Sequence, residues 1–318
     1  MAKAIGNPAP RPASRAPEPD LTQTSTEGGT RTVPELPEVE TARTGIHEQL
    51  GNRRITSVEL RRPGLIVPED GLTIDLLQGQ TIEDTFRHGK YMVWYTEPMA
   101  LVVHMKMTGQ FIARGPDIPG FAAGHPVPSY DADLPHKSTH LILEFECASR
   151  LYLTDIRHFA RIWLLPHDAL DEYLTKLKLG PDLLSPAFTL EDFRARLGKR
   201  TVGRIKPVLL DQTVVAGLGN IYVDEVLWYA QMHPARTCQS LTDDEIVRMY
   251  EGIGKTMEIA LPEGGARIKH GKALTDLGAF PFVHAREGLP CQRCGEPIVK
   301  TQVNNRGTYL CPACQPAP

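Results

Sequence analysis

The chain has 318 residues and a formal net charge of −3, and 41% of its residues are hydrophobic. This length is enough for two or three folded units with separate cores. No apolar run approaches the length of a membrane helix, so a chain that crosses a membrane in this way is not expected. The net charge gives no support to nucleic-acid binding, but a local basic surface can outweigh the charge of a whole chain.

Residues 1–33 are predicted to form a disordered extension, because they are rich in Pro, Ala, Ser and Thr. They lack the apolar block of a secretory signal. A transit peptide is the weaker alternative, since Glu18, Asp20 and Glu27 interrupt the segment and no amphipathic period is visible.

Residues 34–178 are predicted to form a mostly antiparallel β-sandwich with a leading helix. The helix is expected over Pro37–Leu50, where apolar residues recur at helical spacing and Gly51 follows as a stop. Runs of β-branched and aromatic residues predict strands at Ile55–Leu60, Tyr91–Thr96, Leu101–Met107, His140–Glu146, Arg150–Asp155 and Arg161–Leu165.

Residues 179–287 are predicted to form a helical unit after a hinge at Leu179–Ser185. Thr242 and Glu245 have the spacing of a capping box, and an apolar stripe follows them to Ala260. The segment Phe193–Lys206 contains no acid and six basic residues: Arg194, Arg196, Lys199, Arg200, Arg204 and Lys206. Such a run is more often a solvated face than a binding surface, so it needs support from neighbouring features.

Residues 288–318 are predicted to form a zinc-binding β-hairpin. Its ligands would be the two Cys-x2-Cys pairs Cys291, Cys294, Cys311 and Cys314. Two disulfides in a secreted module are the alternative, which is weakened by the lack of a secretory signal. Four thiolates fill a tetrahedron, so one Zn2+ is expected in a structural role, and the chain is expected to be cytoplasmic.

Five motifs occur along the chain in a recognisable order: Pro34–Glu40, His104–Gly109, Thr154–Phe159, Lys206–Asn220 and the cysteine pairs. Together they resemble the formamidopyrimidine-DNA glycosylase and endonuclease VIII family, and Pro-Glu-Leu-Pro-Glu resembles its formamidopyrimidine branch. The resemblance extends from Pro34 to Gln315. It implies an α+β multidomain fold: a β-sandwich, a helix-two-turn-helix domain and a zinc hairpin. It also implies a monomer that acts on damaged double-stranded DNA.

The resemblance implies a base-excision-repair enzyme, a bifunctional glycosylase and AP lyase that removes 8-oxoguanine and formamidopyrimidines. Pro34 would be the secondary amine that forms a Schiff base with the sugar before β/δ-elimination cuts the strand. Glu35 would act as acid and base, and Lys90 would hold a phosphate and assist departure of the base. Taken singly, these residues are equally typical of a turn, a helix N-terminus and a strand edge.

The resemblance also implies residues that hold DNA once the damaged base is extruded. Met107 would plug the gap, Phe159 would wedge the neighbouring step, and Arg157 would bond to the orphaned base. Both apolar residues are also compatible with ordinary strand core. Phosphates would be held by Lys206 and Asn220 around the Gly217–Asn220 turn, which resembles the helix-two-turn-helix, and by Arg306 in the zinc hairpin.

One departure from the family pattern concerns Pro34, which is internal in this sequence. An amide nitrogen has no nucleophilic lone pair, so Pro34 cannot form an iminium while residues 1–33 are attached. Our hypothesis is that translation starts at Val33 from a GTG codon and that the initiating methionine is removed. Maturation by a protease and loss of glycosylase activity are the alternatives.

Other functions remain open at this point. One alternative is an endonuclease VIII-like enzyme that acts on oxidised pyrimidines. Leu36 and the set of Met107, Arg157 and Phe159 argue against it. A non-catalytic damaged-DNA-binding protein would bind abasic analogues without forming an adduct. A zinc-ribbon transcription factor explains only the region from Gly288 onward. The loop within Gly264–Gly288, which covers the extruded base in the family, is shortened and altered, so the sequence does not decide the preferred lesion.

Overall fold

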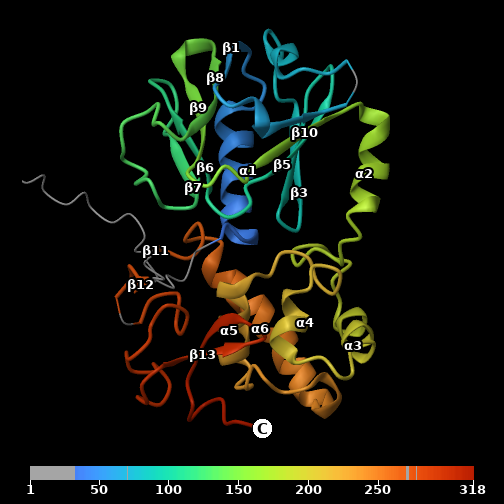
Figure 1. Cartoon of the computed structure of the whole chain (residues 1–318), viewed down its shortest axis with the longest axis vertical. Helices are drawn as coiled ribbons and strands as arrows, with labels where there is room; N and C mark the ends of the chain where they lie inside the picture. The colour runs from blue at the N-terminus through green and yellow to red at the C-terminus, as the bar shows by residue number, and fades with distance from the viewer. Residues whose placement is uncertain (1–32, 70, 270–271, 277) are drawn as a thin grey trace, which may run out of the picture.

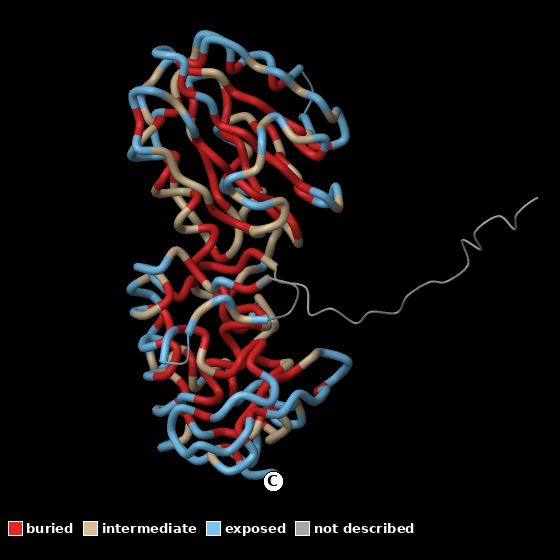
Figure 2. The backbone as a smooth tube through the Cα atoms, turned by 90° about the vertical axis from the view of Figure 1, so that its left-hand side faces the viewer, coloured by how far each residue is buried: buried red, intermediate tan, exposed pale blue. Residues whose placement is uncertain are grey.

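The computed structural model describes residues 33–69, 71–269, 272–276 and 278–318, which form two lobes joined by a narrow middle (Figure 1). Buried backbone runs through this middle, so the lobes are packed together and not merely linked (Figure 2). The predicted disordered extension, except for Val33, lies outside the described residues.

The first lobe is a sandwich of two five-stranded sheets. The antiparallel sheet contains β1 (Ile55–Leu60), β8 (Thr139–Phe145), β9 (Arg150–Asp155), β6 (Gly109–Arg114) and β7 (Phe121–Gly124), in this order. The mixed sheet contains β2 (Ile66–Pro68), β10 (Arg161–Leu165), β5 (Ala100–His104), β4 (Tyr91–Tyr95) and β3 (Asp84–His88). Only the β2–β10 pair in this sheet is parallel, so the predicted antiparallel sandwich is confirmed.

Helix α1 (Leu36–Leu50) begins one residue before the predicted start and packs its apolar face into the core of the sandwich. The predicted strand Leu101–Met107 is too long, since β5 ends at His104. The chain turns after His104, where Lys106 has a positive φ of 55°. The turn brings Gly109 so close to Met105 that an added Cβ on Gly109 would lie 2.8 Å from the Cα of Met105. Met107 therefore lies in a turn and not in a strand.

The second lobe contains α3 (Leu190–Gly198), α4 (Ile205–Leu210), α5 (Asn220–Tyr229) and α6 (Asp243–Ala260), and α2 (Leu170–Lys176) precedes it. The capping box is confirmed, because Thr242 and Glu245 exchange side-chain and backbone hydrogen bonds. Leu36 packs into the core of this lobe although it belongs to α1. A short pair of strands, β11 (Ile268–Lys269) and β12 (Lys272–Ala273), follows α6.

The basic run of this lobe is largely paired with acids. Arg194, Arg196 and Arg200 form ion pairs with Asp243, Asp192 and Asp211, respectively. These pairs are partly exposed, so they contribute little to stability, but they reduce the positive field of the run. The run is therefore a weaker phosphate-binding surface than its sequence indicates.

The zinc hairpin consists of β13 (Val299–Val303) and β14 (Arg306–Leu310) and packs on α5. Its two-residue turn holds Asn304 at φ 48° and Asn305 at φ 60°, the left-handed conformation that suits a tight hairpin. Among the helices of the described residues, none is long and apolar enough to cross a membrane.

Candidate active site and nucleic-acid interface

Glu35 lies where the N-termini of two helices meet. It is the N-cap residue of α1, and its carboxylate accepts hydrogen bonds from the backbone N–H groups of Ile221 (3.0 Å) and Tyr222 (3.4 Å) at the start of α5. The positive end of the α5 dipole thus faces a carboxylate of the same chain. Glu35 therefore occupies two backbone donors of the predicted phosphate seat, and the phosphate contact of Asn220 stays a prediction.

The Gly-Leu-Gly sequence before α5 allows this close approach. Gly217 adopts a φ of 121°, and a Cβ there would lie 2.5 Å from Leu36 Cδ1. A Cβ on Gly219 would lie 2.6 Å from Glu35 Oε2 and still closer to the other two carboxyl atoms. The two glycines are therefore required by contact with residues 35 and 36.

The charges of Lys90 and Glu35 each influence the pKa of the other group. Burial raises the pKa of Glu35 to about 7, against the opposing effect of Lys90. Burial lowers the pKa of Lys90, Glu35 opposes this change, and Arg306 adds to it. A carboxyl group with a pKa near 7 can both donate and accept a proton at neutral pH. Pro34, which is buried, directly precedes Glu35.

The turn that carries Lys90 is held by the other lobe. Asp182 accepts a hydrogen bond from the Gly89 N–H (2.6 Å) and forms an ion pair with Arg87 of β3. His88 contacts the carbonyl of Gly180 at 3.1 Å. Asp182 therefore positions Lys90, a role that the sequence did not reveal although the residue lies in the predicted hinge.

Glu38 is a second residue that sequence reasoning missed. Its carboxylate accepts hydrogen bonds from the Tyr222 hydroxyl (2.7 Å), the Ala266 N–H (2.9 Å) and the Glu35 N–H (3.0 Å). It lines a cavity of about 490 Å³ that has walls from both lobes, including Tyr130 and Arg267. The signal that could have revealed it is the three-residue spacing of Glu35 and Glu38, which form a capping box in the structure.

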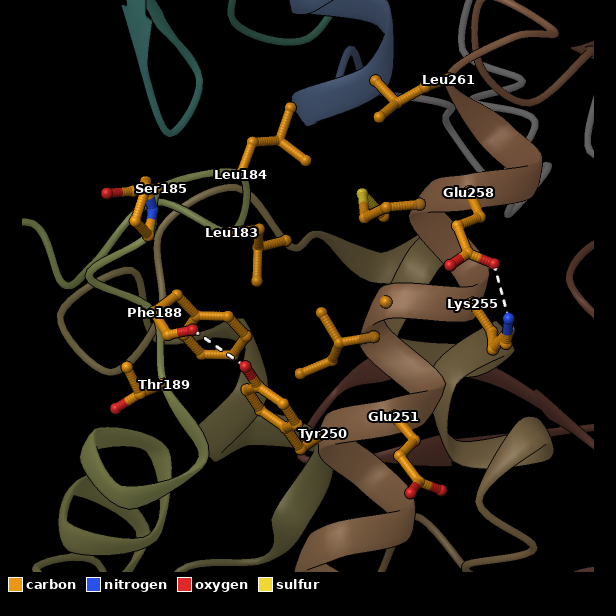
Figure 3. Close-up of a pocket in the computed structure, with 14 residues that line it drawn as sticks. Leu183, Leu184, Ser185, Phe188, Thr189, Tyr250, Glu251, Lys255, Glu258 and Leu261 are labelled. Carbon is orange, nitrogen blue, oxygen red and sulfur yellow. Dashed lines mark hydrogen bonds and ion pairs between the residues drawn. The ribbon is translucent and has the colours of Figure 1, made fainter.

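A larger cavity of about 730 Å³ lies between α6 and residues 183–189 (Figure 3). Its lining is mainly apolar, and Tyr250 closes one side by donating a hydrogen bond to the Phe188 carbonyl at 3.0 Å. Neither Glu35 nor Lys90 lines it, so this cavity is separate from those two residues.

Met107, Arg157 and Phe159 lie together. Arg157 Nη1 lies 3.1 Å from the sulfur of Met107, and its guanidinium lies 4.7 Å from the centre of the Phe159 ring. Asp155 supports this turn by accepting hydrogen bonds from the backbone N–H groups of Arg157 and Ala160. Phe159 is 43% exposed, which is unusual for a large apolar side chain and suits insertion into DNA.

Lys206 departs from its predicted position. Its side chain is 0% exposed, and its Nζ donates to Asp224 Oδ1 (2.6 Å) and to the Gly307 carbonyl (2.9 Å). The expected direct phosphate contact is therefore corrected. Asn220 Nδ2 donates to the same carbonyl at 2.9 Å, whereas Arg306 is exposed at the start of β14.

The four predicted zinc ligands lie together, with all their sulfur atoms within 4.8 Å of one another. A tetrahedral site with Zn–S bonds of about 2.3 Å needs S–S separations of about 3.8 Å. The Trp228 Nε1–H lies 3.3 Å from Cys291 Sγ, and the Cys314 N–H lies 3.4 Å from Cys311 Sγ. These donors stabilise thiolates, so the residues fit one structural zinc.

Comparisons with known families match most of the chain. Residues 33–162 match the formamidopyrimidine-DNA glycosylase N-terminal domain, and residues 179–271 match the H2TH domain of that glycosylase. Residues 288–317 match the zinc finger found in FPG and IleRS.

Curated relatives and solved structures agree with these matches. The formamidopyrimidine-DNA glycosylase of Enterococcus faecalis is 38% identical over 288 residues, which cover 89% of this chain and 97% of the relative. That of Streptococcus pneumoniae is 37% identical, with 89% and 99% covered. The structure of MutM in complex with carbocyclic 8-oxo-G containing DNA has a TM-score of 0.75 at 33% identity, with 89% and 100% covered. A Lactococcus lactis FPG mutant with a Fapy-dG containing DNA has a TM-score of 0.76 at 34% identity, with the same coverage.

Proposed function

The chain belongs to the formamidopyrimidine-DNA glycosylase family, and from this premise we propose how its own residues release a base and cut the strand. It is a DNA-repair enzyme, a bifunctional glycosylase and AP lyase that removes oxidised purines from DNA. The observation that supports the residue roles most directly is the buried Glu35 carboxyl group, which follows Pro34 directly and is held by two backbone N–H groups of α5.

In this proposal the Pro34 nitrogen attacks the sugar C1′ and displaces the base, which leaves an iminium that promotes β- and δ-elimination. Glu35 transfers protons on the opened sugar, because its pKa near 7 allows both protonation states. Lys90 stabilises negative charge on the phosphate and on the departing base. Met107, Arg157 and Phe159 fill the space that the extruded nucleotide leaves.

Contacts with the DNA backbone come from Arg306 and Asn220. Arg306 directly precedes Gly307, and Asn220 Nδ2 donates a hydrogen bond to the Gly307 carbonyl. We also propose that the enzyme acts as a monomer on the bacterial nucleoid in the cytoplasm. The domain limits proposed are 34–178, 179–287 and 288–318. Two apolar clusters support the first boundary, since one consists of residues within 39–164 and the other, apart from Leu36, of residues within 183–285.

The active enzyme must lack the Val33–Pro34 peptide bond, since an amide nitrogen cannot form the iminium and a free amine can. We propose that the mature chain begins at Pro34. Mass spectrometry of the protein from its native host should detect an N-terminal peptide that starts there. A peptide that begins at Ala2 in catalytically active protein would contradict this proposal.

Borohydride trapping on an 8-oxoguanine:cytosine duplex, with a chain that begins at Pro34, tests the catalytic roles. We expect a covalent adduct, and we expect none when the N-terminal nitrogen of Pro34 is acetylated. Tight binding to an abasic analogue without an adduct would instead favour a non-catalytic damage-binding protein. An adduct formed only with an oxidised-pyrimidine duplex would favour the endonuclease VIII-like alternative.

A further inference from the structure

One face of α5 makes polar contacts with the zinc unit along its whole length. Asn220, Asp224 and Trp228 recur at four-residue intervals and contact Gly307, Tyr309 and Cys291, respectively. Residues four apart lie on the same side of a helix, so the contacts form a single stripe. The N-terminus of the same helix holds Glu35.

Asp224 is the charged centre of this stripe and is 0% exposed. Its Oδ1 accepts a hydrogen bond from Lys206 Nζ at 2.6 Å. Its Oδ2 lies 2.7 Å from His284 Nδ1 and accepts a hydrogen bond from the Tyr309 N–H at 3.1 Å. The carboxylate thereby joins α4, the segment before the hairpin, and β14. A buried carboxylate that lost these donors would be strongly destabilising, so the three elements are held in this one arrangement.

The ion pair also fixes the tip of the hairpin. Lys206 Nζ and Asn220 Nδ2 both donate to the Gly307 carbonyl at 2.9 Å, and Gly307 directly follows Arg306. Without the Asp224 carboxylate, the buried ammonium group of Lys206 would keep only the Gly307 carbonyl as a hydrogen-bond acceptor. The Tyr309 N–H would also lose its acceptor, so the hairpin tip would be held less firmly.

We propose that Asp224, through its ion pair with Lys206, is a positioning residue that sets the hairpin tip so that Arg306 grips a phosphate beside the reacting nucleotide. This inference rests on the proposed function, because it assumes that Arg306 holds DNA. Asp224 itself touches neither the substrate nor the reacting atoms. Its effect passes through Lys206, Gly307 and the backbone of β14.

The salt dependence of DNA binding tests this role. For a duplex with an abasic analogue, each phosphate contact contributes about 0.9 to the slope of log K against log salt concentration. We expect Asp224→Asn and Arg306→Ala each to reduce the magnitude of this slope by about 1. The variant that combines both changes should show the same reduction as either change alone. Glu245→Gln is the matched control. It also removes one negative charge from an ion pair of the helical lobe, yet its partner Arg236 lies outside the hairpin. Its slope should equal that of the unmodified protein.

Hydrogen exchange gives a readout that does not depend on DNA or on chemistry. We expect faster exchange at residues 303–310 in Asp224→Asn, with zinc content retained, and no such change in Glu245→Gln. If Asp224→Asn does not fold, the Asp224→Asn/Lys206→Met variant removes both charges together and should give the same lower slope.

An unchanged slope with protected hairpin amides, or slope losses that add in the combined variant, would overturn the positioning role. Failure of borohydride trapping in the unmodified protein would instead refute the proposed catalytic function, and the exchange experiment would still test Asp224.

Discussion

Replacing Gly219 with alanine should remove Glu35 from its seat without straining the backbone. Gly219 has a φ of −131°, which alanine adopts freely, so the effect comes from the added methyl group alone. That group would overlap all three carboxyl atoms of Glu35, including Oε2 at 2.6 Å. The carboxylate must then leave the N–H groups of Ile221 and Tyr222, to which it is bonded at 3.0 and 3.4 Å.

Hydrogen bonds to a charged group contribute about 1.5–3 kcal/mol each. A loss of about 3 kcal/mol in stabilisation of the transition state corresponds to more than about a hundredfold in rate. We therefore expect Gly219→Ala to slow base release by at least about a hundredfold in single turnovers on an 8-oxoguanine:cytosine duplex. Affinity for an abasic-analogue duplex should stay within about threefold, because the residues proposed to hold DNA are unaltered.

Gly254→Ala is the matched control for this experiment. Gly254 lies inside α6, and an added Cβ would meet no heavy atom within 4 Å. Alanine there should stabilise the protein by up to about 1 kcal/mol and leave base release unchanged. Base release by Gly219→Ala at the unmodified rate would refute the role assigned to the α5 N-terminus.

Other variants test the remaining parts of the site. The pKa of Glu35 is 4.5 in its ordinary state and about 7 when buried, so its contribution to stability is complete below pH 4.5 and is lost as the pH rises through about 7. Denaturant unfolding should therefore show Glu35→Gln gaining up to about 3 kcal/mol relative to the unmodified chain between pH 4.5 and pH 8, and equal pH slopes would contradict this. Asp182→Asn should lower the saturating single-turnover rate by about tenfold, because Lys90 would be displaced. An unchanged rate would show that the turn at Gly89 and Lys90 keeps its conformation without Asp182. Trp228→Phe should weaken zinc binding by about tenfold in a chelator competition, because the N–H donor to a ligand sulfur is lost. Trp94→Phe is its control, since Trp94 Nε1 has no hydrogen-bond partner among the described residues; equal zinc affinities for the two variants would contradict the role of Trp228.

The sequence predicted those features whose physical cause is local. The helix that ends at Leu50, the capping box at Thr242 and the cysteine pairs each follow from spacing within a short segment. The sandwich strands β2, β3, β6 and β7 were missed, because they are short or contain many small and polar residues, so no run of β-branched and aromatic residues marks them. Not all the acids that pair with the basic run could be identified from local spacing, since Asp243 lies 49 positions from Arg194.

The site residues divide in the same way. Motifs identified Glu35 and Lys90 by type and order, but burial and coupling between lobes determine their pKa values. Asp182 gave no signal, because nothing local distinguishes a carboxylate that pairs across lobes from a solvated one. Lys206 was expected to hold a phosphate because its motif resembles that of the family, and no local pattern reveals its buried partner Asp224, which is 18 positions away.

The packing around Pro34 explains why the catalytic groups lie between the lobes. Glu35 is bonded to α5, and Leu36 packs in the helical core, although Glu35 caps and Leu36 begins α1, a helix that belongs to the sandwich. Lys90 belongs to the sandwich, and Asp182 of the helical side holds its turn. Both proposed catalytic groups, Glu35 and Lys90, are therefore connected through the chain to the sandwich but are held in place by hydrogen bonds from the helical lobe. A motion that separated the lobes would displace both groups at once, so the catalytic geometry depends on closure of this contact. The Met107, Arg157 and Phe159 cluster is supported by Asp155 within the sandwich alone, and its arrangement is independent of that closure.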